Sequence, residues 1–144
     1  MKKRLFLVLF GALLGLSTSA EVTYLTTEAF KAKVMNYTTY APETGWQGVN
    51  ERPCVVDFYT TWCGPCKRLA PIMDSLSVVY KGQVDFYKAD TEKERELAYF
   101  FQINSIPQVL YVPVKGDPSL MKGLYPVAEI TKIIDGFLLK KETR

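Results

Sequence analysis

The sequence predicts an α/β domain, in which a central mixed β-sheet is flanked by helices on both faces. Two short apolar runs, 54–60 and 84–90, have the pattern of buried strands, and each is followed by a helical pattern. Strands that alternate with helices imply parallel pairing. Two further runs, 108–112 and 120–122, are separated by a turn and predict a hairpin that adds antiparallel strands.

Length and composition predict one globular domain, and the sequence contains no histidine. The chain has 144 residues, 48% of them apolar and 23% charged, which is enough to bury a core. The missing histidine excludes Ser-His-Asp and Cys-His nucleophilic sites and the haem attachment signature Cys-x-x-Cys-His. A zinc site needs four ligands and the chain has three cysteines, so we expect no metal.

Residues 1–20 have the pattern of a secretory signal peptide. A basic start at 2–4 precedes an apolar stretch at 5–16, and the small residues of 17–20 suit cleavage after the last of them. This apolar stretch is too short to span roughly 30 Å of hydrocarbon as a helix. We therefore expect a mature domain of residues 21–144 that is exported, most simply to a bacterial periplasm.

The net positive charge belongs to this first segment. Three of the 18 basic residues lie in it, so the remainder carries 15 basic and 15 acidic side chains. A balanced charge provides no general attraction to nucleic acid or to an anionic membrane surface. We expect no nucleic-acid partner.

The mature chain begins with a short strand and a helix. Residues 23–25 predict an edge strand, after which Thr26 or Thr27 can cap a helix that runs to about Met35. From 36 to 53 the apolar residues follow no period, which predicts an extended loop of roughly 18 residues. We expect its aromatic residues to pack the loop onto the domain; a wall facing a substrate is the alternative.

Two helices follow the strands at 54–60 and 84–90. The first begins near Cys63, and Pro71 is expected to bend it. Thr91 is expected to cap the second, which has acidic residues in its first turn and ends near position 101. The chain closes with an amphipathic helix, whose apolar face collects Val127, Ile130, Ile133, Ile134, Phe137 and Leu138.

A pair of cysteines lies where the strand 54–60 turns into a helix. Unpaired N–H groups and the helix dipole stabilise a thiolate at Cys63 and lower its pKa below about 8.5. Cys66 lies one turn further on, beneath Cys63 on the same face. This predicts an exposed nucleophile at Cys63 and a sheltered, resolving thiol at Cys66. Gly64 allows the turn into the helix, and Pro65 fixes φ in its first turn.

The hexapeptide Trp62–Lys67 resembles the active site of the thioredoxin family, and the similarity extends over nearly the whole mature chain. Four further landmarks match that family: Asp57 its buried acid, Lys88 the basic neighbour of that acid, Ile106–Pro107 its cis-proline site facing the disulfide, and Gly123 the glycine of its substrate groove. The resemblance implies the thioredoxin fold and a protein thiol–disulfide oxidoreductase that needs no cofactor.

The resemblance also implies a role for each landmark. Asp57 would be a buried carboxyl of raised pKa that takes the proton of Cys66 during resolution, and Lys88 would moderate that pKa. A cis peptide would expose the Ile106 backbone for strand-like pairing with a substrate chain. Substrate contact is implied for Trp62, Gly64, Pro65, Ile106, Pro107 and Gly123.

Three features depart from the family pattern and bear on the choice of partner more than on the reaction. Tyr59 stands where thioredoxins commonly have tryptophan, Gln108 where threonine usually follows the cis-proline, and the 36–53 loop is longer than the corresponding connection. Cys54 is additional. At the start of a buried strand we expect it to be a small apolar filler rather than a reactive thiol.

The direction of electron flow has two interpretations. Export places the protein in an oxidising space, whereas Gly-Pro between the cysteines resembles the reducing members of the family. We favour an exported monomer that reduces or exchanges disulfides of substrate proteins and is recharged by a membrane electron donor. The alternative is a thiol oxidase or isomerase in oxidative protein folding. A binding domain stapled by Cys63 and Cys66 ranks third, because closing so short a loop stabilises little.

Overall fold

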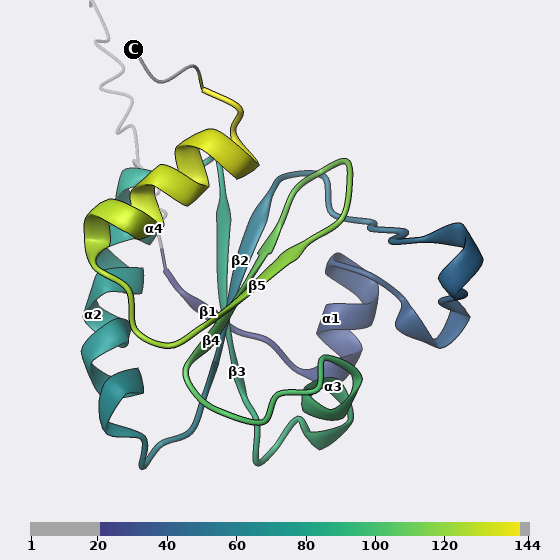
Figure 1. Ribbon diagram of the computed structural model, residues 1–144, viewed down its shortest axis with the longest axis horizontal. Coiled ribbons are helices and arrows are strands. Elements are labelled where there is room, and N and C mark those ends of the chain that lie inside the picture. The colour runs from purple at the N-terminus through teal and green to yellow at the C-terminus, as the bar shows by residue number, and fades with distance from the viewer. Residues whose placement is uncertain (1–20, 142–144) are drawn as a thin grey trace, which may run out of the picture.

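The computed structural model describes residues 21–141, so the expected signal peptide at 1–20 lies outside the described residues. A five-stranded sheet separates two layers of helices (Figure 1). Its strands are β1 (Thr23–Tyr24), β2 (Cys54–Tyr59), β3 (Asp85–Asp90), β4 (Gln108–Val112) and β5 (Ser119–Lys122). They lie in the order β1-β3-β2-β4-β5. Strand β3 is parallel to β1 and β2, and β4 is antiparallel to β2 and β5, which confirms the predicted mixed sheet.

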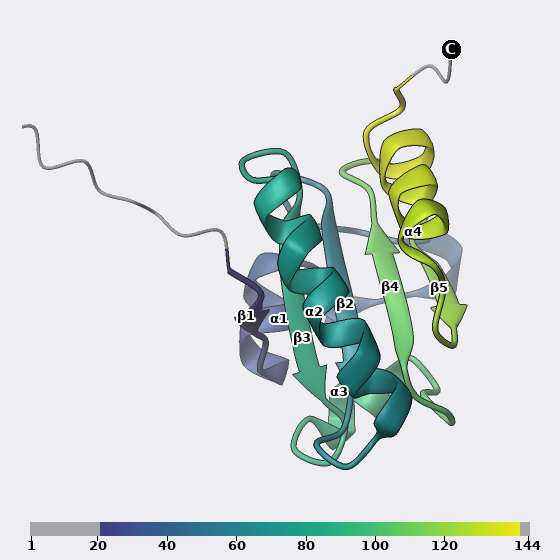
Figure 2. The ribbon, with the colours of Figure 1, turned by 90° about the vertical axis from the view of Figure 1, so that its left-hand side faces the viewer.

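Helices cover both faces of the sheet, as predicted. The helices are α1 (Thr27–Lys33), α2 (Gly64–Val79), α3 (Arg95–Phe100) and α4 (Val127–Ile133), which continues as a π-helical segment, Ile134–Leu138. Figures 1 and 2 show α2 and α4 on one face, with α1 and α3 on the other. Within residues 21–141 no helix combines the length and the apolar character needed to cross a membrane.

Strand β2 supplies side chains to two hydrophobic cores, because successive residues of a strand point to opposite faces. The core under α2 and α4 contains Val55, Leu69, Met73, Ile130 and Ile134. The core under α1 and α3 contains Phe30, Val56, Phe58 and Leu97. The central strand is therefore buried on both sides, which explains its nearly continuous apolar sequence.

Helix α3 begins later than predicted, and the predicted N-cap at Thr91 is wrong. The chain first makes a turn in which the carbonyl of Asp90 accepts from the Glu94 nitrogen at 2.8 Å. The Asp90 carboxylate accepts from the Glu92 nitrogen at 3.0 Å, which closes this local turn before the helix begins. The Thr91 hydroxyl instead donates to the carbonyl of Tyr59 at 3.4 Å.

The apolar face of the C-terminal helix is narrower than predicted. Ile130, Ile134 and Leu138 are buried, whereas Val127 and Phe137 are 48% and 37% exposed. The buried residues recur at every fourth position and form a single stripe along the helix. Val127 and Phe137 therefore lie toward solvent although they are apolar, whereas Ile133 is partly buried against the core.

The 36–53 loop packs on the face that carries α3. It contains two 3₁₀ turns, Tyr37–Thr39 and Pro42–Thr44. The Tyr37 ring stacks on Phe100 with ring centroids 4.4 Å apart, and the Trp46 ring lies 6.3 Å from that of Phe101. These contacts confirm that the loop aromatics pack the loop onto the domain.

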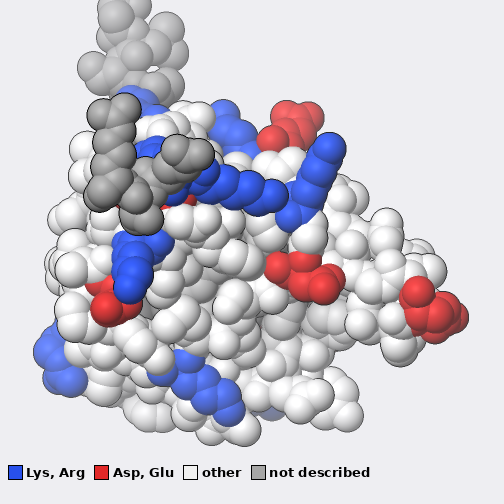
Figure 3. Space-filling view, turned by 45° about the horizontal axis from the view of Figure 1, so that its top comes forward, with Lys and Arg blue, Asp and Glu red and all other residues white. Residues whose placement is uncertain are grey.

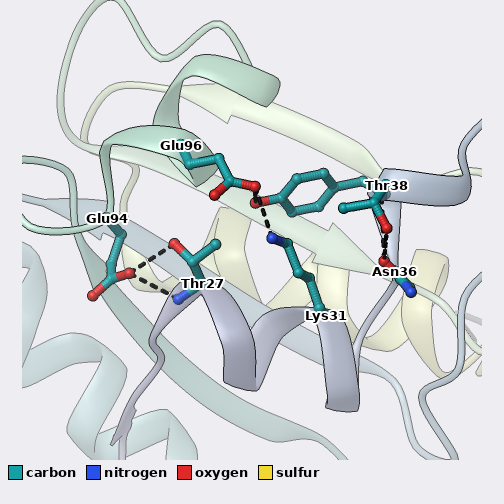
Figure 4. A network of polar contacts seen from close by, with 7 residues as sticks. Thr27, Lys31, Asn36, Thr38, Glu94 and Glu96 are labelled. Atoms are coloured by element: carbon teal, nitrogen blue, oxygen red, sulfur yellow. Dashed lines mark hydrogen bonds and ion pairs between the residues drawn. The ribbon is translucent and has the colours of Figure 1, made fainter.

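Polar contacts join α1 to α3 (Figure 4). The Glu96 carboxylate accepts from the Lys31 ammonium at 2.7 Å and from the Tyr37 hydroxyl at 2.9 Å. The N-cap of α1 is Thr26, whose hydroxyl accepts from the Ala29 nitrogen at 3.1 Å. This decides between the two threonines that the sequence offered.

Acidic and basic side chains are mixed on one face of the molecule (Figure 3). On the face shown in Figure 3, acidic and basic side chains are interspersed rather than gathered by sign. Three ion pairs lie within the described part of the chain: Lys31–Glu96, Arg52–Asp85 and Lys141–Asp135. Each includes at least one side chain that is partly exposed, where such pairs contribute little to stability.

Candidate active site

The two cysteines lie at the junction between β2 and α2, the position predicted for them. Cys63 is the N-cap residue of α2, and its Sγ accepts from the backbone nitrogen of Cys66 at 3.2 Å. Gly64 and Pro65 form the first turn of the helix. A sulfur in this place receives a helix N–H that has no intrahelical partner, which favours the thiolate form when the pair is reduced.

Cys63 and Cys66 are joined by a disulfide, with Cα atoms 5.3 Å apart. Both residues are buried, with exposed fractions of 4% and 3%. The prediction of an exposed Cys63 beside a sheltered Cys66 is therefore wrong for this oxidised form. The reason is geometric, since the Cys63 sulfur lies back against the first turn of α2 instead of pointing to solvent.

Asp57 is a buried acid on β2, with an exposed fraction of 4%. It lies two residues after Val55, which packs in the core under α2, so its side chain faces the same helix. Among the described residues its Oδ1 has no hydrogen-bond partner. Burial raises the pKa of Asp57 to about 7, and the charge of Lys88 offsets part of that rise.

Lys88 is the register neighbour of Asp57 on β3, yet the two do not form an ion pair in the described structure. Its ammonium lies 4.3 Å from the centre of the Tyr24 ring instead. Lys88 therefore acts on Asp57 through its charge at a distance. The contact with Tyr24 was not foreseen from the sequence.

The topology brings two further predicted residues to the cysteine end of the sheet. The Ile106–Pro107 peptide bond is cis, as the resemblance implied. Pro107 precedes Gln108, which pairs with Phe58 near the end of β2. Gly123 follows β5, and its nitrogen donates to the carbonyl of Pro107 at 2.8 Å. Its φ of +98° is a conformation that other residues rarely adopt.

Comparison with known proteins settles the family. The thioredoxin family model matches residues 21–136. A thioredoxin from Borreliella burgdorferi is 39% identical over 113 residues, which cover 78% of this chain and 94% of the relative. The chain belongs to the thioredoxin family.

Other relatives agree. An M-type chloroplastic thioredoxin from Spinacia oleracea is 36% identical over 89 residues, which cover 62% of this chain and about half, 49%, of the relative. The crystal structure of chloroplastic thioredoxin z has the same fold, with a TM-score of 0.66 at 22% identity over 79% of this chain and 91% of that one. Like its thioredoxin homologues, the protein is a thiol–disulfide oxidoreductase, with Cys63 and Cys66 at disulfide distance.

Two further residues near this thioredoxin site, Trp62 and Gln108, make side-chain hydrogen bonds. Trp62 is 66% exposed, and its indole nitrogen donates to the Glu92 carboxylate at 3.0 Å. Gln108 is fully buried, and its amide nitrogen donates to the carbonyl of Ser105 at 2.8 Å, which fixes the turn before Ile106. The sequence predicts Glu92 only as an acidic residue in the first turn of the next helix, because no local pattern pairs it with Trp62.

The two remaining unusual positions are buried or partly buried. Cys54 is a free thiol with its side chain in the core under α1 and α3, and burial raises its pKa. This agrees with a small apolar filler. Tyr59 lines a small cavity of about 230 Å³ together with Tyr24 and Lys88.

Proposed function

We propose that the protein is an exported thioredoxin that reduces or exchanges disulfides in other exported proteins. The observation that carries the redox role is the Cys63–Cys66 pair at the start of α2, together with a buried acid on β2 whose pKa is about 7. The signal-like pattern of residues 1–20 supports export.

In the reducing direction, the Cys63 thiolate attacks one sulfur of a substrate disulfide. That S–S bond breaks, a mixed disulfide forms between Cys63 and the substrate, and the other substrate sulfur leaves and takes a proton. Asp57 takes the proton from the Cys66 thiol, and the Cys66 thiolate attacks the Cys63 sulfur. The substrate leaves with two thiols, and the two electrons have come from the Cys63–Cys66 pair.

Asp57 suits the proton transfer because its pKa lies near neutral pH. A carboxyl of ordinary pKa would be a weaker base toward a thiol, and one of much higher pKa would already hold a proton. The buried position of Asp57, on the face of the sheet that packs against α2, supports this role.

Substrate contact is assigned to the residues around the disulfide. The exposed Trp62 ring, the Gly64–Pro65 turn, the Ile106 backbone before the cis-proline and Gly123 surround this end of the sheet. An extended substrate chain would pair with the Ile106 backbone as a strand pairs with a sheet edge. Partners of this kind are proteins with disulfides or thiols, and the protein would act as a monomer.

After each turnover the Cys63–Cys66 disulfide must be reduced again. An exported protein is separated by the membrane from the thiols of the cytoplasm, so the proposal includes a membrane electron donor. If the pair is kept oxidised in its compartment, the same steps run in reverse and introduce disulfides. The oxidising character of exported compartments is the observation that favours this second candidate.

Insulin reduction with dithiothreitol tests the chemistry. Cys63→Ala is expected to abolish the acceleration, and Cys66→Ala to accumulate the mixed disulfide, while Cys54→Ala leaves the rate unchanged. Full activity in Cys63→Ala would exclude the dithiol mechanism. Equilibration with glutathione tests the direction, since a potential above roughly −180 mV would favour the oxidase or isomerase. Cell fractionation of the full chain and of a chain lacking 1–20 tests export.

A further inference from the structure

A row of side chains crosses the sheet next to the active site. Tyr24 on β1 is in register with Lys88 on β3, Lys88 with Asp57 on β2, and Asp57 with Val109 on β4. Register partners on neighbouring strands point to the same face and lie about 4.8 Å apart. Lys88 therefore stands between an aromatic ring on one side and a buried carboxyl on the other, within reach of both.

The structure shows which neighbour Lys88 contacts. Its ammonium lies 4.3 Å from the centre of the Tyr24 ring, a distance at which a cation is attracted to the face of an aromatic ring. Among the described residues, neither Lys88 nor Asp57 takes part in an ion pair. The lysine is thus directed away from the acid that it could neutralise.

We infer that Tyr24 is a positioning residue for Lys88: its ring holds the ammonium toward the outer edge of the sheet and leaves the Asp57 carboxyl without an ion pair. The alternative arrangement would bring opposite charges together in a buried site and favour the ionised carboxylate. By preventing that arrangement, Tyr24 would control the proton affinity of Asp57 from two strands away. The catalytic consequence rests on the proposed function, because it requires that Asp57 accept the proton of Cys66.

Among the described titratable groups around the row, Lys88 is the one whose charge acts on the pKa of Asp57. Tyr59 on the same strand and Tyr111 on β4 both have pKa values raised by burial, so both are neutral there. The cavity shared by Tyr24, Tyr59 and Lys88 is also lined by charged residues of β3 and the turn that follows it: Asp90, Lys93 and Glu94. On α2, Cys66 does not titrate while it is held in the disulfide.

The test is an NMR titration of the Asp57 carboxyl carbon in the oxidised protein, with the signal assigned by its loss in Asp57→Asn. Tyr24→Leu is expected to lower the pKa of Asp57 by about 1 unit or more, the effect of an opposite charge at contact distance. Tyr24→Phe keeps the ring and is expected to leave it unchanged. In a Lys88→Met background, Tyr24→Leu is expected to have no effect.

An unchanged Asp57 pKa in Tyr24→Leu would overturn the proposal, as would an equal fall in the Lys88→Met background. Tyr24→Trp is a control for the possibility that a substitution at position 24 changes the Asp57 pKa only by loosening β1. Tryptophan keeps an aromatic ring and binds cations more strongly than tyrosine. This variant is expected to keep the pKa at or above that of the wild type, and a fall would overturn the proposal. No turnover is needed, so failure of the proposed reductase function would appear separately, in the insulin assay.

Discussion

The Glu94 carboxylate caps the first turn of α1 from across the domain. Its Oε2 accepts from the backbone nitrogen of Thr27 at 2.8 Å and from the Thr27 hydroxyl at 2.7 Å (Figure 4). The two residues are 67 positions apart in the sequence, and the contact is partly buried. It satisfies an N–H that has no intrahelical partner and places negative charge at the helix N-terminus.

Glu94→Ala is expected to destabilise the protein by about 2 kcal/mol, because two hydrogen bonds to a charged group are lost. Urea unfolding measures the change. Glu43→Ala, in an exposed part of the 36–53 loop, is the matched control and should remain within about 0.5 kcal/mol of wild type. Equal stability of the two variants would contradict the role assigned to Glu94.

Tyr37 is expected to hold the long loop to the domain through two separable contacts. Tyr37→Phe removes the hydrogen bond to Glu96 and should destabilise by about 1 kcal/mol. Tyr37→Ala also removes the stack on Phe100 and should destabilise by about 3 kcal/mol. Tyr40→Ala, which removes a more exposed ring, should have a smaller effect than Tyr37→Ala in the same unfolding experiment. The opposite order would show that Tyr40 is the anchor.

Asp57 is expected to make stability depend on pH. Its pKa is about 7 in the folded protein against an ordinary value of 3.8, so the folded state binds this proton more tightly than the unfolded state. The free energy of unfolding should therefore fall as the pH rises from about 4 to about 7. Asp57→Asn removes this loss, and at pH 8 it should be more stable than wild type by up to about 4 kcal/mol.

The measurement is urea unfolding of the oxidised protein at several pH values between 3 and 8. Asp74→Asn, an exposed acid on α2, serves as the control and should keep the wild-type pH dependence. Parallel curves for wild type and Asp57→Asn would show that Asp57 titrates alike in the folded and unfolded states.

Cys54 is expected to be inert while the protein is folded. It is buried, and burial raises its pKa, so little thiolate forms. The disulfide-bonded protein should take up no iodoacetamide under native conditions and one label per chain after unfolding, because Cys54 is the free cysteine in residues 21–141. Cys54→Val should take up none in either state. Native labelling at the rate of an exposed thiol would refute the burial.

Local patterns in the sequence were enough for much of this fold. The strand Gln108–Val112 has the predicted bounds, and β2 is found where the apolar run predicted it. Such elements depend on neighbouring residues and on burial, both of which a sequence displays. The cysteine pair was equally accessible, because its position at a helix start depends only on the elements that flank it.

Contacts set by tertiary structure could not be predicted in this way. Whether Lys88 meets Tyr24 or Asp57 depends on how β1 pairs with β3, and a one-dimensional pattern does not contain that register. The wrong N-cap at Thr91 has a similar cause, since the Thr91 hydroxyl donates to the carbonyl of Tyr59, a residue distant in the sequence, instead of capping a helix. The burial of Cys63 depends on how its sulfur lies against the helix it caps.

The brevity of β1 has a consequence for self-association. Only two residues of β1 are in register with β3, at Tyr87 and Lys88, so much of the outer edge of β3 lacks a strand partner within the described chain. Such edges invite a strand from another molecule. Asp85 lies in the part of this edge that β1 does not cover, and a charge there disfavours intermolecular β-pairing. We therefore expect the charge of Asp85 to protect the uncovered part of this edge against aggregation.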